Sequence, residues 1–198
     1  MSGLGFGLSL IVAIGAQNAF VLQQGLRREH VLPIVVLCAA SDAILIAVGV
    51  AGLGSLLQAA PWLLIVARIA GAVFLVGYGI LAARRALAPT ALIASATGPR
   101  ISLRAAIATC AALTWLNPHV YLDTIVLLGS VAGTHGPDRW WFGLGAAAGS
   151  ILWFTALGFG ARLLRPLFSR PASWRVLDAL IAAVMMSIAI GLLLGLGQ

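Results

Sequence analysis

The chain has 198 residues, of which 62% are hydrophobic and only 9% are charged. A soluble domain carries about 25% charged residues, so this composition excludes an ordinary water-facing surface and predicts an integral membrane protein. The net charge of +7 comes from arginines clustered between apolar runs, which favours membrane orientation over nucleic-acid binding.

Six apolar runs are long enough for membrane-spanning helices, which need about 20 residues each. They cover residues 3–23, 31–53, 62–83, 105–131, 141–161 and 177–196. The runs are continuous, whereas the strands of a membrane barrel would alternate over about ten residues. We therefore expect an all-α integral membrane protein with six transmembrane helices in one polytopic domain, residues 1–198.

The first run contains two neighbouring uncharged amides, Gln17 and Asn18, within the stretch AIGAQNAFVL. No positively charged segment precedes this run, so we expect a retained span rather than a signal peptide. If the run were only half-inserted, the number of spans would fall to five.

The second and third runs each contain a charged residue, Asp42 and Arg68. A charge in the hydrocarbon costs at least about 2.5–3.5 kcal/mol, so it usually faces a cavity or a partner. Asp42 is predicted to bind a proton or a cation, or alternatively to form a buried ion pair with Arg68. Arg68 is then a counter-ion, a site for a substrate carboxylate, or a residue whose side chain reaches the membrane surface.

The longest connection, residues 84–104, separates three runs from three and is predicted to be a cytoplasmic linker. An odd number of spans makes the two halves, about 1–83 and 105–198, run in opposite directions. Asn18 and Asn117 occupy the first span of their halves. This pattern predicts two inverted three-helix repeats, with chance similarity between apolar helices as the alternative.

The fourth run contains NPHVYLD, residues 117–123. Pro118 removes a helical hydrogen bond and disfavours helical dihedrals at Asn117, which predicts a helix break that lines a cavity, or a simple kink. His119 and Asp123 are four residues apart and share a helix face. That spacing suits a proton relay, or a hydrogen-bonded pair at the outer interface.

Ten of the twelve arginines fall in the first, third and fifth connections, which hold two, four and four. The second connection has none and the fourth has Arg139 alone. The positive-inside rule therefore places loops one, three and five in the cytoplasm and both termini outside. Asp178 follows Arg175 by three residues at the start of the sixth run, which predicts a local ion pair.

Small residues and cysteines complete the pattern. The GxxxG pairs at 145–149 and 191–195 predict close helix packing or self-association into a homo-oligomer. Cys38 and Cys110 lie in apolar runs outside any CxxC pair, so they indicate neither a disulfide framework nor a metal site. Without metal-ligand spacing, a nucleophile elbow or a phosphate-binding loop, we expect no cofactor, no metal and no enzymatic activity.

Three stretches resemble signature regions of the lysine/arginine exporter family: GAQNAFVLQQGLRR, SDAILIAVGVAG and TWLNPHVYLDT. The related homoserine/threonine/leucine exporter branch typically has Gly-Pro-Gly-Pro near the first motif and lacks the Gln-Asn pair. Many family members have proline where this chain has Ala16, so the first span must break at Gly15 alone or stay continuous. The resemblance assigns the substrate and proton pathway to these motif positions: Gln17, Asn18, Asp42, Asn117, Pro118, His119, Tyr121 and Asp123.

The resemblance implies a secondary-active exporter of L-lysine and L-arginine in a bacterial inner membrane, with substrate, protons and lipid as its partners. Intramembrane carboxylates suit the substrate's cations, and Arg68 is added to the pathway on charge alone. Proton entry would offset the cost of exporting positive charge, about 2.3 kcal/mol per 100 mV, which predicts antiport. The alternatives are export of a neutral amino acid or small cation, or a non-transporting membrane scaffold.

Overall fold

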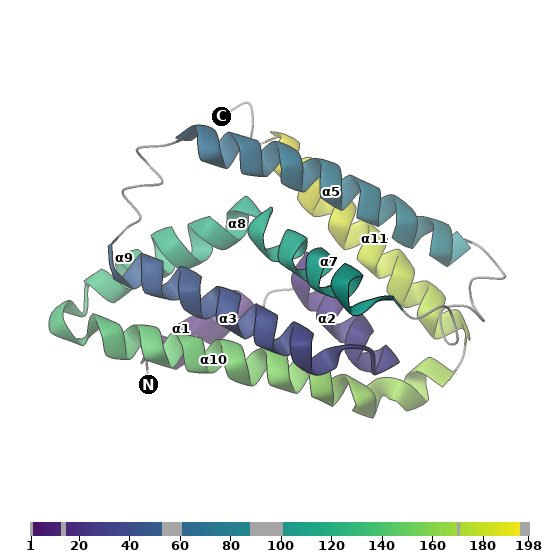
Figure 1. The fold of residues 1–198 in the computed structure, drawn as a ribbon, viewed down its shortest axis with the longest axis horizontal. Coiled ribbons are helices and arrows are strands. Elements are labelled where there is room, and N and C mark those ends of the chain that lie inside the picture. Colours follow the sequence, from purple (N-terminus) through teal and green to yellow (C-terminus); the bar gives the residue numbers. More distant parts are fainter. Residues whose placement is uncertain (1, 13–14, 53–60, 88–100, 170, 195–198) are drawn as a thin grey trace.

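The fold is entirely helical over the residues that the computed structural model describes, which are 2–12, 15–52, 61–87, 101–169 and 171–194 (Figure 1). Its four long helices are α3 (Val31–Val50), α5 (Pro61–Leu87), α10 (Arg139–Gly160) and α11 (Pro171–Leu194). All four contain segments long and apolar enough to cross a membrane, and each falls on a predicted run. Helix α11 begins before its predicted run, which places Asp178 inside the helix.

The first predicted run is broken into two helices, α1 (Ser2–Ile11) and α2 (Ala16–Arg27), whose axes differ by 84°. Gly15, just before α2, has an extended backbone with φ −121° and ψ 171°. The break therefore forms without a proline at position 16. Counted as one bent span, α1 and α2 raise the candidate spans among the described residues from four to five.

The fourth predicted run is also broken. Helix α7 (Leu103–Trp115) is followed by α8 (Pro118–Tyr121), the π-helical segment η1 (Leu122–Leu128) and α9 (Gly129–Gly133). Asn117 has an extended backbone, φ −97° and ψ 106°, as the residue before a proline prefers. The Asn117-Pro118 step is therefore a helix break rather than a simple kink. The short 3-10 segments η2 (Gly136–Asp138) and η3 (Ala161–Ser169) flank α10.

The helices form two groups (Figure 1). Helices α5 and α11 pack along each other, whereas α10 packs against α1, α2 and α3. One buried apolar cluster, which includes Phe20, Leu113, Phe154 and Met185, joins the two groups. On the outside, large apolar side chains are exposed along the long helices, as expected of surfaces that contact lipid.

One of the predicted GxxxG pairs packs inside the chain. A Cβ added to Gly145 would lie 2.9 Å from the Leu4 nitrogen, and one added to Gly149 would lie 3.2 Å from the Leu4 oxygen. This pair therefore brings α10 against α1. The space around Gly191 is open, and its partner Gly195 lies outside the described residues.

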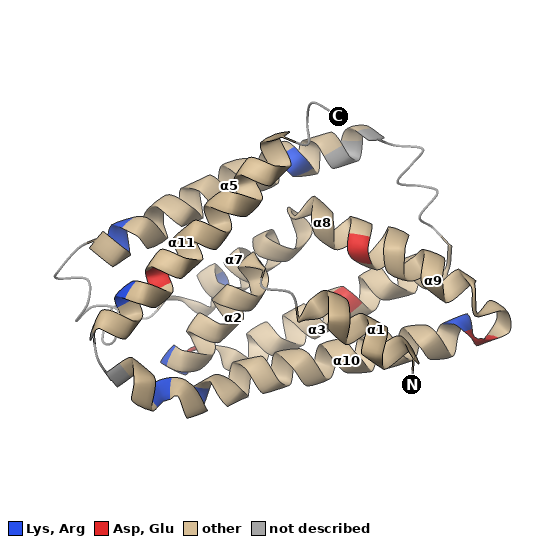
Figure 2. Cartoon of the chain, turned by 180° about the vertical axis from the view of Figure 1, so that it is seen from behind, with Lys and Arg blue, Asp and Glu red and all other residues tan. Residues whose placement is uncertain are grey.

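Charged residues are unevenly distributed along the molecule (Figure 2). Arginines gather where α2, α5 and α10 end and where α3, α7 and α11 begin, which we call the arginine-rich end. Its described arginines are Arg27, Arg28, Arg84, Arg85, Arg104, Arg162, Arg165 and Arg175. Arg100 and Arg170 lie outside the described residues, and Arg139 begins α10 at the opposite end.

Candidate functional site

A cavity of about 310 Å³ lies between the two helix breaks. Its walls come from both halves of the sequence, including α1, α2, α3, η1, α10 and α11. The structure brings six of the nine predicted site residues to this cavity: Gln17, Asn18, Asp42, Asn117, His119 and Asp123.

Asn18 spans the first break. Its Nδ2 donates a hydrogen bond to the Ile11 carbonyl at the end of α1, at 2.8 Å, and its Oδ1 accepts one from Trp153 Nε1 of α10, at 3.3 Å. A helix end inside a membrane leaves backbone carbonyls without partners. Asn18 therefore satisfies one of these carbonyls and fixes the break against α10.

Gln17, beside Asn18, has an amide N–H group that forms no hydrogen bond to the described residues. The Nε2 atom of this group is buried. A buried donor without a partner costs about 1–3 kcal/mol. Because Gln17 lines the cavity, this N–H group is available to an acceptor on a bound molecule, such as a carboxylate.

The second break is held in the same way. The Tyr121 hydroxyl donates to the Trp115 carbonyl at 2.6 Å, so a side chain after the break again satisfies a carbonyl before it. Asn117 caps α8, because its Oδ1 accepts from the His119 backbone N–H at 3.1 Å. Pro118 takes the first helical position, where a missing N–H is tolerated.

Asp42 lies in the cavity wall with only 4% of its surface exposed. Its Oδ2 accepts a hydrogen bond of 2.6 Å from Ser150 Oγ of α10, a distance typical of hydroxyl–carboxylate bonds. The adjacent Ser41 accepts one from Trp115 Nε1 at 3.2 Å, which ties α3 to the second break. The buried carboxylate is thus positioned by α3 and α10 together.

Asp123 and His119 also line the cavity, from η1 and α8. Asp123 is half-buried, whereas His119 is exposed. No hydrogen bond joins these two described side chains. π-helical segments occur frequently at functional sites, and here η1 carries Asp123 into the same cavity as Asp42.

Three predicted site residues do not line the cavity. Pro118 and Tyr121 shape the second break, and Arg68 lies on α5, which packs against α11, α7 and α8. The alternative of a buried ion pair is not formed, since the described ion pairs do not include Arg68 with Asp42, whose carboxylate accepts a hydrogen bond from Ser150. The sequence does not reveal which helices are neighbours, so it could not identify this serine.

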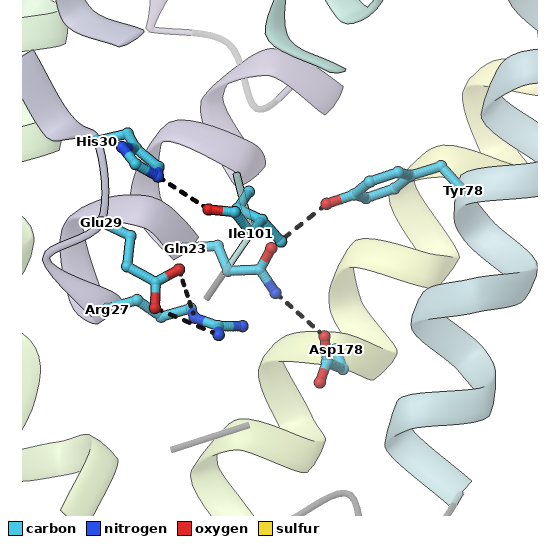
Figure 3. A network of polar contacts seen from close by, with 7 residues as sticks. All are labelled: Gln23, Arg27, Glu29, His30, Tyr78, Ile101 and Asp178. Carbon is cyan, nitrogen blue, oxygen red and sulfur yellow. Dashed lines mark hydrogen bonds and ion pairs between the residues drawn. The ribbon is translucent and has the colours of Figure 1, made fainter. Parts of the chain in front are cut away.

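A second polar cluster lies toward the arginine-rich end (Figure 3). Gln23 accepts a hydrogen bond from the Tyr78 hydroxyl and donates one to Asp178 Oδ1, both at 3.3 Å. Arg85 Nε lies 3.2 Å from the same Asp178 oxygen. The predicted pair of Asp178 with Arg175 is therefore wrong, since the carboxylate pairs across helices with α5.

Sequence reasoning missed this second cluster because its members are spread over three runs. The signal it offered was a second amide pair, Gln23-Gln24, six residues after Gln17-Asn18. Nearby, Arg27 pairs with Glu29 at 3.4 Å and His30 Nε2 lies 2.9 Å from the Ile101 carbonyl (Figure 3).

The chemistry offered by the cavity is that of carboxylates and amides. Within the described segments, no group of three His, Cys, Asp or Glu side chains is placed to hold a metal ion. Cys38 and Cys110 are buried thiols with sulfur atoms 3.3 Å apart, outside the cavity lining. The cavity can therefore bind a cation through its carboxylates and an anionic group through the Gln17 amide.

Comparison with protein families gives a match to the family described as LysE type translocator, over residues 8–196. A Mycobacterium bovis protein with a provisional name as an amino-acid transporter is 52% identical over 183 residues, 92% of this chain and 90% of that protein. No solved structure matches.

Proteins named arginine exporter are also similar to this chain. The one from Yersinia enterocolitica is 44% identical over 193 residues, 96% of this chain and 93% of the relative. The one from Escherichia coli O157:H7 is 43% identical over 192 residues, 96% of this chain and 90% of the relative.

Proposed function

The chain belongs to the LysE type translocator family, and from that premise we propose that it exports a basic amino acid, L-arginine or L-lysine, across a bacterial inner membrane. The observation that carries the proposal is a single cavity in which Asp42, Asp123 and the unpaired Gln17 amide meet between two helix breaks. The arginine exporters among its relatives support the same class of substrate.

The cavity chemistry complements each part of a basic amino acid. The side-chain cation and the α-ammonium group both suit carboxylates, which are supplied by Asp42 and Asp123. The α-carboxylate suits the Gln17 amide and the N–H groups at the start of α2, where the helix dipole favours negative charge. Broken helices bind substrates in this way in many transporters.

The proposed membrane arrangement has six spans in two inverted repeats, with α1–α2 and α7–α9 as the broken first span of each half. Each half has a broken helix beside the cavity, which supports this arrangement. The arginine-rich end lies in the cytoplasm and both termini lie outside, by the positive-inside rule.

Proton entry drives the proposed export. Moving a cationic substrate out of a negative interior costs about 2.3 kcal/mol per charge at 100 mV. Asp42 binds either a proton or the substrate cation, so one proton enters when the substrate leaves. Its place in the cavity wall, bonded to a neutral serine rather than to a cation, supports this exchange.

Reconstitution in liposomes tests the proposal. We expect the protein to exchange labelled arginine and lysine, and a pH gradient to drive their net movement. Asp42→Asn should abolish the gradient-driven movement, whereas Asp138→Asn, in the exposed η2 segment, should retain it.

The outcomes separate the alternatives. Undiminished gradient-driven transport in Asp42→Asn would rule out Asp42 as the coupling residue. Full activity with threonine and none with arginine would point to export of a neutral amino acid. Absence of flux with every labelled substrate would favour the alternative that the protein is a non-transporting membrane scaffold.

A further inference from the structure

We propose that Asp178 forms a second binding site for the side-chain cation of the substrate, on the arginine-rich side of the cavity, and that Arg85 occupies this site when substrate is absent. The inference rests on the proposed export of a basic amino acid. It assigns a role to the second polar cluster, which the cavity residues do not explain.

The first observation is the depth at which Asp178 is held. Its side chain is 3% exposed, although it lies two turns inside the arginine-rich end of α11. A carboxylate so buried in a membrane protein needs partners, and here Arg85 and Gln23 supply them from two other helices.

The second observation is that Asp178 and Tyr78 both contact the Arg85 guanidinium group. The Arg85 guanidinium carbon lies 5.7 Å from the centre of the Tyr78 ring, and its Nε bonds to Asp178. A carboxylate beside an aromatic face is a favourable environment for an arginine side chain. The cluster therefore already recognises the group that an arginine substrate would bring.

The third observation is that Arg85 is held less completely than Asp178. Its side chain is 34% exposed, and its buried Nη2 has no hydrogen-bond partner among the described residues. The arginine can therefore leave toward solvent at its own end of the molecule, whereas the carboxylate stays buried. This asymmetry is what exchange of one guanidinium for another requires.

The fourth observation is where the cluster lies relative to the cavity. On α2, Gln23 follows Gln17 by six residues, about 9 Å along the helix. On α11, Asp178 precedes Ile188 of the cavity wall by ten residues, about 15 Å. Phe20, Ile181 and Met185 fill the space between as buried side chains.

The cluster thus joins α2, α5 and α11 on the arginine-rich side of the cavity. A substrate that comes from that side meets Asp178 before it meets Asp42. Exchange of Arg85 for the substrate cation breaks the ion pair between α5 and α11, whereas the Tyr78 hydroxyl still joins α5 to Gln23.

Transport in membrane vesicles of both orientations tests the inference through the apparent KM for labelled arginine. Asp178→Asn should raise KM about tenfold or more where arginine is added at the arginine-rich face, since it removes a charge-assisted contact. Arg85→Gln should lower KM at the same face, because it removes the competing guanidinium. Added at the opposite face, arginine should give an unchanged KM in both variants.

The matched control is Arg84→Gln, on the exposed side of α5 next to Arg85, which should leave both KM values unchanged. A purely structural ion pair predicts a different result, in which both partner variants lose protein or kcat alike and KM does not move. That result, or KM changes of the same sign in the two variants, would overturn the inference. If Asp178→Asn does not fold, Arg85→Gln alone tests the inference. An unchanged or raised KM in Arg85→Gln would contradict competition between Arg85 and the substrate for Asp178.

Failure of the proposed function gives a separate signal. If the unaltered protein transports neither arginine nor lysine, both the function and this inference are wrong. If it transports them and the two variants do not shift KM in opposite directions, only the inference is wrong.

Discussion

Ser150 is the residue on which the position of the Asp42 carboxylate depends. It is completely buried on α10 and donates the 2.6 Å hydrogen bond to Asp42 Oδ2. Ser150→Ala should therefore lower arginine transport about tenfold or more, the usual effect of losing a hydrogen bond to a charged group. Initial rates over a range of arginine concentrations in proteoliposomes measure this loss.

Ser187→Ala provides the control for that substitution. Ser187 is an exposed serine on α11, and its hydroxyl bonds to the Val184 carbonyl of its own helix. Its replacement should leave transport unchanged. Equal losses in the two variants would show that removing any hydroxyl from these helices impairs transport, and the Ser150–Asp42 bond would then have no special role.

At the residue scale, the sequence is informative where a polar side chain stands in an apolar run. Gln17, Asn18, Asp42, Asn117 and Asp123 are conspicuous for this reason, and the structure brings all of them to one cavity. Serines and tryptophans are ordinary residues of membrane helices and give no such contrast. The supporting partners therefore had to come from the fold: Ser41, Trp115, Ser150 and Trp153.

At the scale of elements, α5 approaches the second break closely at Gly71. A Cβ added to Gly71 would lie 2.0 Å from the Leu116 carbonyl oxygen, whereas nothing lies within 4 Å of one added to Gly77 on the same helix. Gly71→Ala should destabilise the protein by about 1–3 kcal/mol, the usual cost of overpacking. Gly77→Ala should be neutral or stabilising, since alanine favours helices over glycine.

Thermal unfolding of the two variants in detergent distinguishes them, because each adds the same methyl group to the same helix. Gly77→Ala should melt at the same temperature as the unaltered protein or higher. Gly71→Ala should have the lowest melting temperature of the three. A Gly71→Ala variant as stable as Gly77→Ala would mean that α5 does not pack against the Leu116 carbonyl.

The two helix breaks differ in how well the sequence predicts them. Pro118 marks the second break openly, because proline cannot continue the hydrogen-bond ladder. The first break has Ala16 at the corresponding place. Hydropathy and proline position therefore do not distinguish a broken helix from a continuous one here. What supports that break is the Asn18 side chain bonded to Ile11, a contact seven residues apart that no periodic pattern reveals.

At the scale of the whole molecule, the uneven distribution of arginine predicts its orientation in the membrane. Thr134, exposed between α9 and α10, and Arg84, exposed at the end of α5, lie at opposite ends. In intact cells, Thr134→Cys should react with a membrane-impermeant maleimide, whereas Arg84→Cys should react only after permeabilisation. Both native thiols are buried, so the unaltered protein serves as the unlabelled control. The reverse pattern would invert the proposed topology.

The contact of Gly71 with Leu116 has a mechanical consequence for the pair formed by α5 and α11. Close-packed backbone atoms resist compression, so any tilt of α5 relative to the second break must pivot near Gly71. A rigid rotation about it moves the Arg85 end and the Trp62 end of α5 in opposite directions.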